Sequence, residues 1–144
     1  MTTKTYVALV ADVTVDKASG NVRVERVVAA ADAGQAINPD GLSSQLEGGI
    51  IQGASWTLKE QVNFDKERIL SRDWVGYPIL TFPEVPHVEV SIIDRPEQPS
   101  LGAGEASQGP IAAAIANAIH HATGARLRDL PFTPERVKAA IANG

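Results

Sequence analysis

The stretch at residues 102–110, Gly-Ala-Gly-Glu-Ala-Ser-Gln-Gly-Pro, holds the residue types best suited to chemistry. Closely spaced glycines let the backbone approach a ligand without a Cβ in the way. An alanine-rich helical pattern follows at residues 111–123, and a helix beginning there would offer free N–H groups and a positive dipole end to an anion. Glu105 is the only ionisable residue between Glu97 and His120. It is therefore a candidate catalytic base, the alternative being an ordinary turn with a solvated glutamate.

A second unusual stretch is a helix that carries three internal glycines. Apolar residues recur every fourth position over residues 42–58, which predicts an amphipathic helix, with Asp40 as a candidate cap. Gly48, Gly49 and Gly53 lie inside it, and each glycine costs a helix interior about 1 kcal/mol relative to alanine. The pattern predicts very close packing against another backbone or a ligand. Polar side chains lie on or beside that face, although such side chains are usually only solvated: Gln45, Glu47 and Gln52.

The remaining patterns describe a scaffold. Alternation over residues 5–16, turn residues at 17–21 and a β-rich run over 21–31 predict a hairpin, with either a bulge near Arg26 or burial on both sides there. Residues 59–65 and 67–71 predict a short β-ribbon, and residues 86–94 a further strand. A last helix is expected after Thr133-Pro134-Glu135.

We count four or five strands, mostly in hairpins, and three helices, which gives an α+β fold without alternating β-α-β units. Gly102-Ala103-Gly104 is half of a dinucleotide-binding fingerprint, but Ser107 stands where the third glycine would be. A Rossmann fold is therefore disfavoured.

Composition narrows the function classes. A length of 144 residues predicts one domain over 1–144, and a net charge of −4 without a basic stripe argues against nucleic acid as a partner. The chain has no cysteine, so it cannot form disulfides or ligate iron–sulfur clusters itself. No apolar run approaches the length of a membrane span. The adjacent His120 and His121 would point to different helix faces, so we interpret both as surface residues and expect no metal ligands in this chain.

Three blocks carry a family resemblance. They are Gln-Ala-Ile-Asn-Pro-Asp-Gly-Leu-Ser-Ser-Gln-Leu-Glu-Gly-Gly-Ile-Ile-Gln-Gly from position 35, Leu-Gly-Ala-Gly-Glu-Ala from 101, and Leu-Pro-Phe-Thr-Pro-Glu-Arg-Val from 130. In this order they resemble the C-terminal part of the molybdenum-binding large subunit of the xanthine oxidase/aldehyde oxidase family. The chain looks most like the bacterial branch that oxidises isoquinoline or aldehydes. The resemblance covers nearly the whole chain, and it implies one repeat-like half of a molybdopterin-binding domain.

The resemblance also implies an activity and roles for particular residues. The family's molybdenum–pyranopterin cofactor, as such or as its cytosine dinucleotide, hydroxylates an aldehyde or N-heterocycle with water as the oxygen source. Glu105 would be the base that deprotonates the Mo-bound hydroxide, and Gln45 would hydrogen-bond the pterin. Gly102, Ala103 and Gly104 would pack against the cofactor through their backbone. Ala33 departs from the family pattern, because many relatives carry cysteine before the glycine.

The chain is much shorter than a family subunit, so the resemblance implies a fragment or one half of a split subunit that is inactive alone. Its expected partners are the remainder of the molybdenum subunit and an iron–sulfur subunit, with no membrane association. The expected compartment is the cytoplasm, or the periplasm if an upstream part carries an export signal. The alternative is a non-catalytic module that keeps the fold and docks to a partner subunit.

Overall fold

Two long antiparallel strands begin the fold in the computed structural model, which describes residues 5–143. Strand β1 (Tyr6–Val15) pairs with β2 (Val22–Asp32), and the side chains of β1 alternate between exposed and covered positions. The register shifts where Asp12 faces Arg26 but Val13 faces Val24, so Glu25 is an extra residue on β2. This confirms the bulge predicted near Arg26 from the change in hydrophobic phase.

The third strand joins the sheet in parallel. Strand β3 (His87–Ile92) pairs with β2, which gives the order β1-β2-β3, and helix α1 (Pro39–Leu58) lies between β2 and β3 in the chain. This β-α-β crossover corrects the prediction that such units are absent. The α+β class is confirmed, although the described residues hold three strands rather than four or five. The periodicity of a strand is the same in parallel and antiparallel pairs, so it could not predict the pairing.

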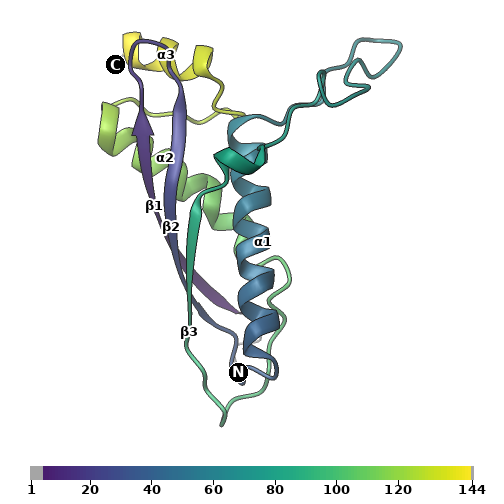
Figure 1. The fold of residues 1–144 in the computed structure, drawn as a ribbon, viewed down its shortest axis with the longest axis vertical. Helices are drawn as coiled ribbons and strands as arrows, with labels where there is room; N and C mark the ends of the chain where they lie inside the picture. Colours follow the sequence, from purple (N-terminus) through teal and green to yellow (C-terminus); the bar gives the residue numbers. More distant parts are fainter. Residues whose placement is uncertain (1–4, 144) are drawn as a thin grey trace.

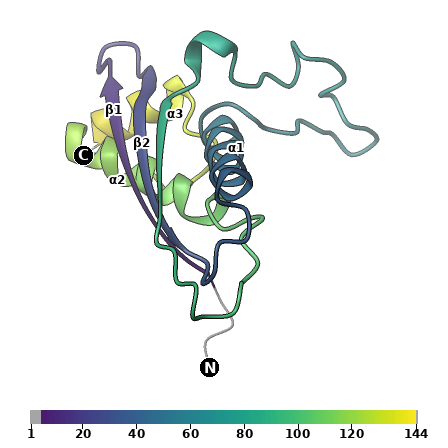
Figure 2. The same ribbon diagram turned by 60° about the horizontal axis from the view of Figure 1, so that its bottom comes forward.

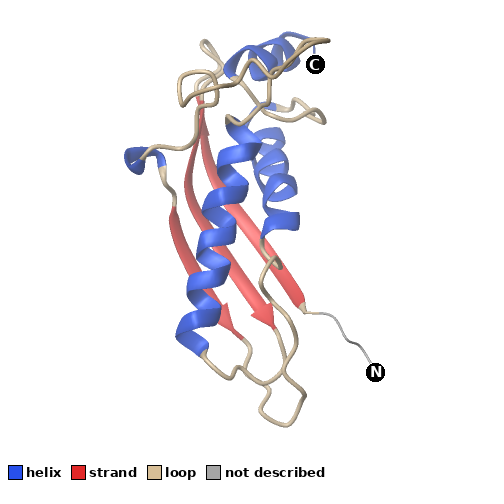
Figure 3. Ribbon diagram, turned by 90° about the vertical axis from the view of Figure 1, so that its right-hand side faces the viewer, coloured by secondary structure: helices blue, strands red, loops and turns tan. Residues whose placement is uncertain are grey.

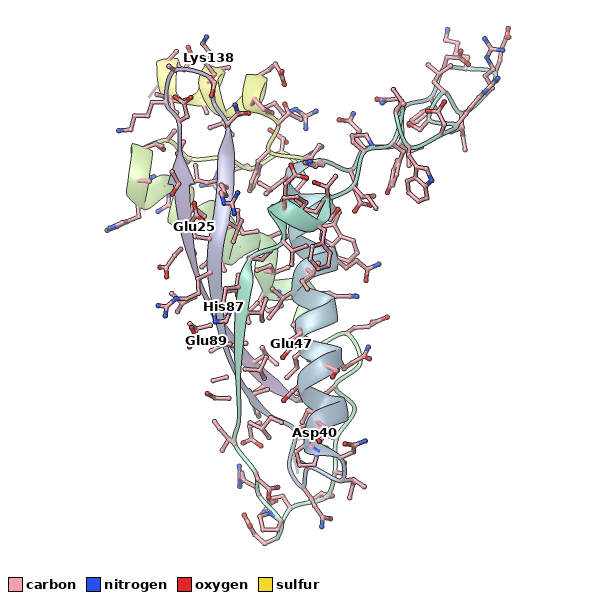
Figure 4. The ribbon with its side chains drawn as sticks, in the orientation of Figure 1. Glu25, Asp40, Glu47, His87, Glu89 and Lys138 are labelled. Carbon is pink, nitrogen blue, oxygen red and sulfur yellow. The ribbon has the colours of Figure 1, made fainter. Side chains whose placement is uncertain are left out.

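Helix α1 starts one turn earlier than its apolar pattern. The side-chain oxygen of Asn38 accepts a hydrogen bond from the N–H of Gly41 at 3.0 Å, and Pro39 follows as the first helical residue. Asn38 is therefore the N-cap, and the prediction of Asp40 as the cap is wrong. Asp40 lies in the first turn, where a carboxylate interacts favourably with the helix dipole (Figure 4).

Helices α1 and α2 (Gln108–Thr123) lie side by side on one face of the sheet (Figure 3). A Cβ added to Gly49 would overlap Oγ of Ser107, and one added to Gly53 would overlap Cγ2 of Ile111. This confirms close packing at these two glycines, and the element that packs against them is α2 with the residue before it. The core between the helices and the sheet contains the following fully buried side chains: Val27, Ala29, Ile50, Ala54, Ile111, Ile115 and Ile119.

The last helix closes the end of the hairpin. Helix α3 (Pro134–Asn143) begins after Thr133, whose hydroxyl accepts from the N–H of Arg136 at 3.4 Å, and it lies against the β1–β2 turn (Figure 1). Gly20 in that turn has φ of +83° and leaves no room for a Cβ beside the carbonyl of Pro134. His120 near the end of α2 is partly buried and its Nδ1 has no partner among the described residues, so the prediction that it is a surface residue is wrong.

Residues 60–82 leave the body as a long loop, here called the projecting arm (Figures 1 and 2). The predicted β-ribbon is reduced to one antiparallel bridge between Phe64 and Ile69. The short 3₁₀ helix η1 (Phe82–Glu84) returns the chain to β3. None of the helices in residues 5–143 combines the length and hydrophobicity needed to cross a membrane.

Candidate cofactor-binding site

The structure brings Gln45 onto the glycine loop. Gln45 lies in the second turn of α1, and its Nε2 donates a hydrogen bond to the carbonyl oxygen of Gly104 at 2.9 Å. These residues are 59 positions apart in the sequence, and both are exposed. The side chain and the loop that the resemblance assigned to one cofactor therefore lie at one place on the surface.

Three further contacts hold the loop in position. The hydroxyl of Thr5 donates to the carbonyl of Gly102 at 2.7 Å, and the N–H of Leu101 donates to the carbonyl of Ala33 at 2.9 Å. The buried hydroxyl of Ser107 donates to the carbonyl of Leu46 at 2.9 Å. A buried hydroxyl left unpaired costs about 1–3 kcal/mol, so this bond strongly favours the observed packing of the loop on α1.

Sequence reasoning missed the positioning role of Thr5 and Ser107. In the sequence, Ser107 stands out only as the residue that breaks a dinucleotide fingerprint. Its place directly before an alanine-rich helix that must pack closely on a glycine-rich one was the available signal. Gln108 adds a further link between the helices, because its Nε2 donates to Oε1 of Gln52 at 2.8 Å.

A surface cleft of about 290 Å³ lies beside the loop. Gly102 and Gly104 face open space, since nothing lies within 4 Å of an added Cβ at either position. The cleft is small for a binding site, as ligand pockets are typically about 300–1,000 Å³. Its walls come from the β2–α1 connection, the first turns of α1 and the glycine loop: Ala33, Gln35, Ala36, Ile37, Asn38, Gly41, Leu42, Gln45, Ser100, Leu101, Ala103 and Gly104.

One wall of the cleft is fixed by two aspartates. Asp32 accepts from the N–H of Gly34 and from Arg95, both at 3.0 Å, and Asp94 accepts from the N–H of Ala36 at 3.1 Å. The Gly34 N–H first, and then the Arg95 guanidinium, lower the pKa of Asp32 below its ordinary value. Both carboxylates thereby order the connection that runs past the cleft.

Glu105 follows the loop directly and is exposed. Helix α2 begins at Gln108 rather than at residue 111, so Glu105 lies three residues before the helix, and its carbonyl accepts from the N–H of Gln108 at 3.2 Å. Pro110 lies in the first turn of α2, and Ser107 makes no side-chain cap there. Glu105 is thus one residue from the carbonyl that holds Gln45.

The polar groups around the cleft are side-chain amides, the hydroxyl of Ser100 and backbone groups. Within residues 5–143 there is no cluster of three or more His, Asp or Glu side chains that could hold a metal ion. What this chain offers to a ligand is hydrogen bonding from Gln45, close backbone approach at Gly102 and Gly104, and the nearby carboxylate of Glu105. This set suits an organic cofactor that carries its own metal, and a side chain at either glycine would fill the space that such a cofactor needs.

The chain is an α+β domain in which the glycine loop and the Gln45 amide lie together on the surface. The family model for the molybdopterin cofactor-binding domain matches residues 1–86. The chain is 52% identical over 136 residues to one subunit of the nicotinate dehydrogenase of Pseudomonas putida, a match that covers 94% of this chain and 12% of that protein. The beta subunit of isoquinoline 1-oxidoreductase from Brevundimonas diminuta is 36% identical over 90% of this chain and 16% of its own length. The chain therefore belongs to the molybdopterin cofactor-binding domain family of the xanthine oxidase type.

Solved structures agree with this assignment. The aldehyde oxidoreductase of Desulfovibrio gigas superposes with a TM-score of 0.84 at 33% identity, covering 96% of this chain and 15% of that one. Quinoline 2-oxidoreductase of Pseudomonas putida superposes with a TM-score of 0.81 at 28% identity, covering 90% of this chain and 18% of that one. The chain thus spans less than a fifth of the length of these relatives.

Proposed function

We propose that residues 1–144 form a single domain that contributes one wall of the active site in a molybdenum hydroxylase. The substrate would be an N-heterocycle or an aldehyde, with water as the oxygen source. The relatives named nicotinate dehydrogenase, isoquinoline 1-oxidoreductase and aldehyde oxidoreductase support this substrate class. The observation that carries the proposal is the hydrogen bond between Gln45 and Gly104, directly beside Glu105.

Each site residue has a distinct role in this proposal. Gln45 anchors the glycine loop through Nε2, and its Oε1 remains to accept a hydrogen bond from the pterin. Gly102, Ala103 and Gly104 let the cofactor approach their backbone, since open space lies over both glycines. The carboxylate of Glu105 accepts a proton at Oε during the hydroxylation, as a general base must stand within reach of the reacting group. The bound molybdenum cofactor supplies the redox chemistry of the substrate C–H oxidation.

The proposal also includes components outside this chain. Without cysteine the chain offers no ligand for an iron–sulfur cluster, so electrons would leave through clusters on a partner subunit. The cofactor could carry a cytosine nucleotide beyond the pterin. The small cleft accommodates only part of such a molecule, and the remainder of the molybdenum subunit would enclose the rest.

A chimeric subunit tests the proposed function. In the related nicotinate dehydrogenase of Pseudomonas putida, the matched segment is replaced by this sequence, and the assembled enzyme is assayed for molybdenum content and nicotinate oxidation. We expect molybdenum in the chimera and oxidation of nicotinate. A chimera that binds molybdenum and assembles with its partner subunits but does not oxidise nicotinate would contradict the catalytic role and favour a non-catalytic module.

A further inference from the structure

The projecting arm carries most of the exposed apolar surface of this chain. Of the thirteen large hydrophobic residues exposed among residues 5–143, eight lie between positions 62 and 82. The most exposed are Phe82 at 94%, Val75 at 92%, and Trp74 and Phe64, both at 74%. Large apolar side chains gathered on one exposed segment in this way usually mark an interaction site.

The arm has a defined conformation although it lacks a core. Its tip is closed by hydrogen bonds from the N–H of Asp65 to the carbonyl of Arg68 at 3.0 Å and from that of Leu70 to the carbonyl of Asn63 at 2.7 Å. At its base the hydroxyl of Tyr77 donates to Glu60 at 2.7 Å. A surface that is already ordered loses less conformational entropy when a partner covers it.

The solvent-exposed area of the whole chain is larger than expected for a monomer of this mass. The structure exposes 8870 Å². A compact monomer of 15.2 kDa would expose about 7,100 Å² by the usual scaling of area with mass. The excess of about 1,800 Å² is twice what one partner buries in an interface of ordinary size, and it matches one side of an obligate interface.

Gly48 points to the place where the partner approaches. Its neighbours Gly49 and Gly53 find their close contacts in α2, but nothing in this chain lies within 4 Å of an added Cβ at Gly48. Gly48 instead lines a groove of about 520 Å³ between the outer face of α1 and the base of the arm. The other groove residues are Ile51, Gln52, Ser55, Glu60, Trp74, Tyr77, Ile79 and Leu80.

We propose that the arm and this groove form the docking surface for the remainder of the molybdenum subunit. An apolar segment of that polypeptide packs on Trp74, Val75 and Phe82, and its backbone passes over Gly48. In these relatives the matched region is only 12–19% of the chain, so each of them has a large further polypeptide that could cover it. The inference rests on the proposed membership in such a subunit, although it does not depend on catalysis.

Hydroxyl-radical labelling of Trp74 and Phe82 tests the docking surface, with the radical dose calibrated by free tryptophan added to each sample. The labelling is compared between the isolated chain and the chimeric nicotinate dehydrogenase. We expect both side chains to be labelled several-fold less in the chimera. Equal labelling in the two samples would overturn the proposal, as would a chimera that stays insoluble under conditions in which the parent subunit folds.

The substitution Gly48→Ala gives an independent test, because it should change the melting temperature in opposite directions in the isolated chain and in the chimera. In the isolated chain, Gly48→Ala removes helix-interior glycine without a clash, so its melting temperature should rise by about 2–4 °C. In the chimera the same Cβ would obstruct the partner backbone, so the melting temperature should fall. A rise in both contexts would contradict close approach at Gly48.

Two other outcomes have definite meanings. If Trp74 is already protected in the isolated chain, and sedimentation shows a dimer that Val75→Asp abolishes, a second copy is the occupant and the proposal is wrong. If the chimera protects Trp74 but contains no molybdenum, the docking surface stands and the proposed function fails. The docking surface and the catalytic role can therefore be judged separately.

Discussion

Gln45 and Gly104 are joined by a hydrogen bond of 2.9 Å from the side-chain amide to the backbone carbonyl. This bond ties the second turn of α1 to the glycine loop at the point where the chain reaches Glu105. Because Oε1 of Gln45 accepts no hydrogen bond from residues 5–143, one half of the amide positions the loop and the other half is available to a ligand.

Substitution Gln45→Ala should therefore release the loop and remove a cofactor contact. A hydrogen bond of this kind contributes about 0.5–1.5 kcal/mol, so cofactor affinity should fall by about 2–10-fold for each bond lost. We expect less molybdenum and pterin per chimeric subunit, faster amide hydrogen exchange at residues 102–106, and a smaller loss of turnover per molybdenum. An unchanged cofactor content in Gln45→Ala would contradict the assigned role.

The glycines of α1 should respond differently to the same substitution in the isolated chain. Gly53→Ala places a methyl group against Ile111 and should reduce the free energy of unfolding by about 1–3 kcal/mol. Gly48→Ala meets open space and should increase it by about 0.5–1 kcal/mol. Urea unfolding of both variants measures the difference. Two changes of the same sign would show that α2 does not pack on Gly53 as described.

The ion pair between Lys59 and Glu84 predicts a loss of stability in acid. The hydrogen bond from Lys59 first, and those from Thr81, lower the pKa of Glu84 from 4.5 to about 2. A carboxylate with a lowered pKa stabilises the fold above its unfolded pKa and loses that effect as the pH falls toward its folded value. Stability should therefore decline between about pH 5 and pH 2. The side chains are 29% and 38% exposed, so solvent screening limits the contribution to about 1 kcal/mol.

Urea unfolding at pH 7 and at pH 3 checks this prediction in the isolated chain. Glu84→Gln should lower stability at pH 7 and should flatten the dependence on pH. Glu67→Gln, on the projecting arm, is the control, because its carboxylate makes no hydrogen bond or ion pair with residues 5–143. If Glu84→Gln loses as much stability between pH 7 and pH 3 as the unmodified chain, another group causes the decline.

The sequence predicted those elements whose signals are local. The alternation of residues 5–16, the phase change near Arg26 and the four-residue repeat of α1 depend on neighbouring side chains, and the structure confirms each of them. The parallel pairing of β2 with β3 depends on partners distant in sequence, so periodicity carried no information about it. The helix cap was misplaced by two residues because Asn38 and Asp40 are equally suitable cap residues on either side of Pro39.

The candidate site was predictable from motifs more than from physics. The glycines and the exposed acid suggested a ligand loop, but only the family resemblance joined Gln45 to it. The close packing predicted from three glycines is confirmed at Gly49 and Gly53, which contact α2, whereas Gly48 lines the groove and has no close neighbour among residues 5–143. The exposed charged residues Glu25, His87 and Glu89, on the face of the sheet opposite the helices, belong to no motif that would predict a site (Figure 4).

Turnover per bound molybdenum in the Glu105→Gln chimera tests whether Glu105 is the general base. Glutamine keeps the size and the hydrogen-bonding reach of glutamate but cannot accept the proton as a general base. Such a base typically contributes about 10²–10⁴-fold, so nicotinate oxidation per molybdenum should fall by at least about that factor while molybdenum content stays near that of the unmodified chimera. Glu97→Gln, on the exposed loop before residue 102, should leave turnover unchanged. Near-normal turnover per molybdenum in Glu105→Gln, or a defect explained entirely by lost cofactor, would contradict the role proposed for Glu105.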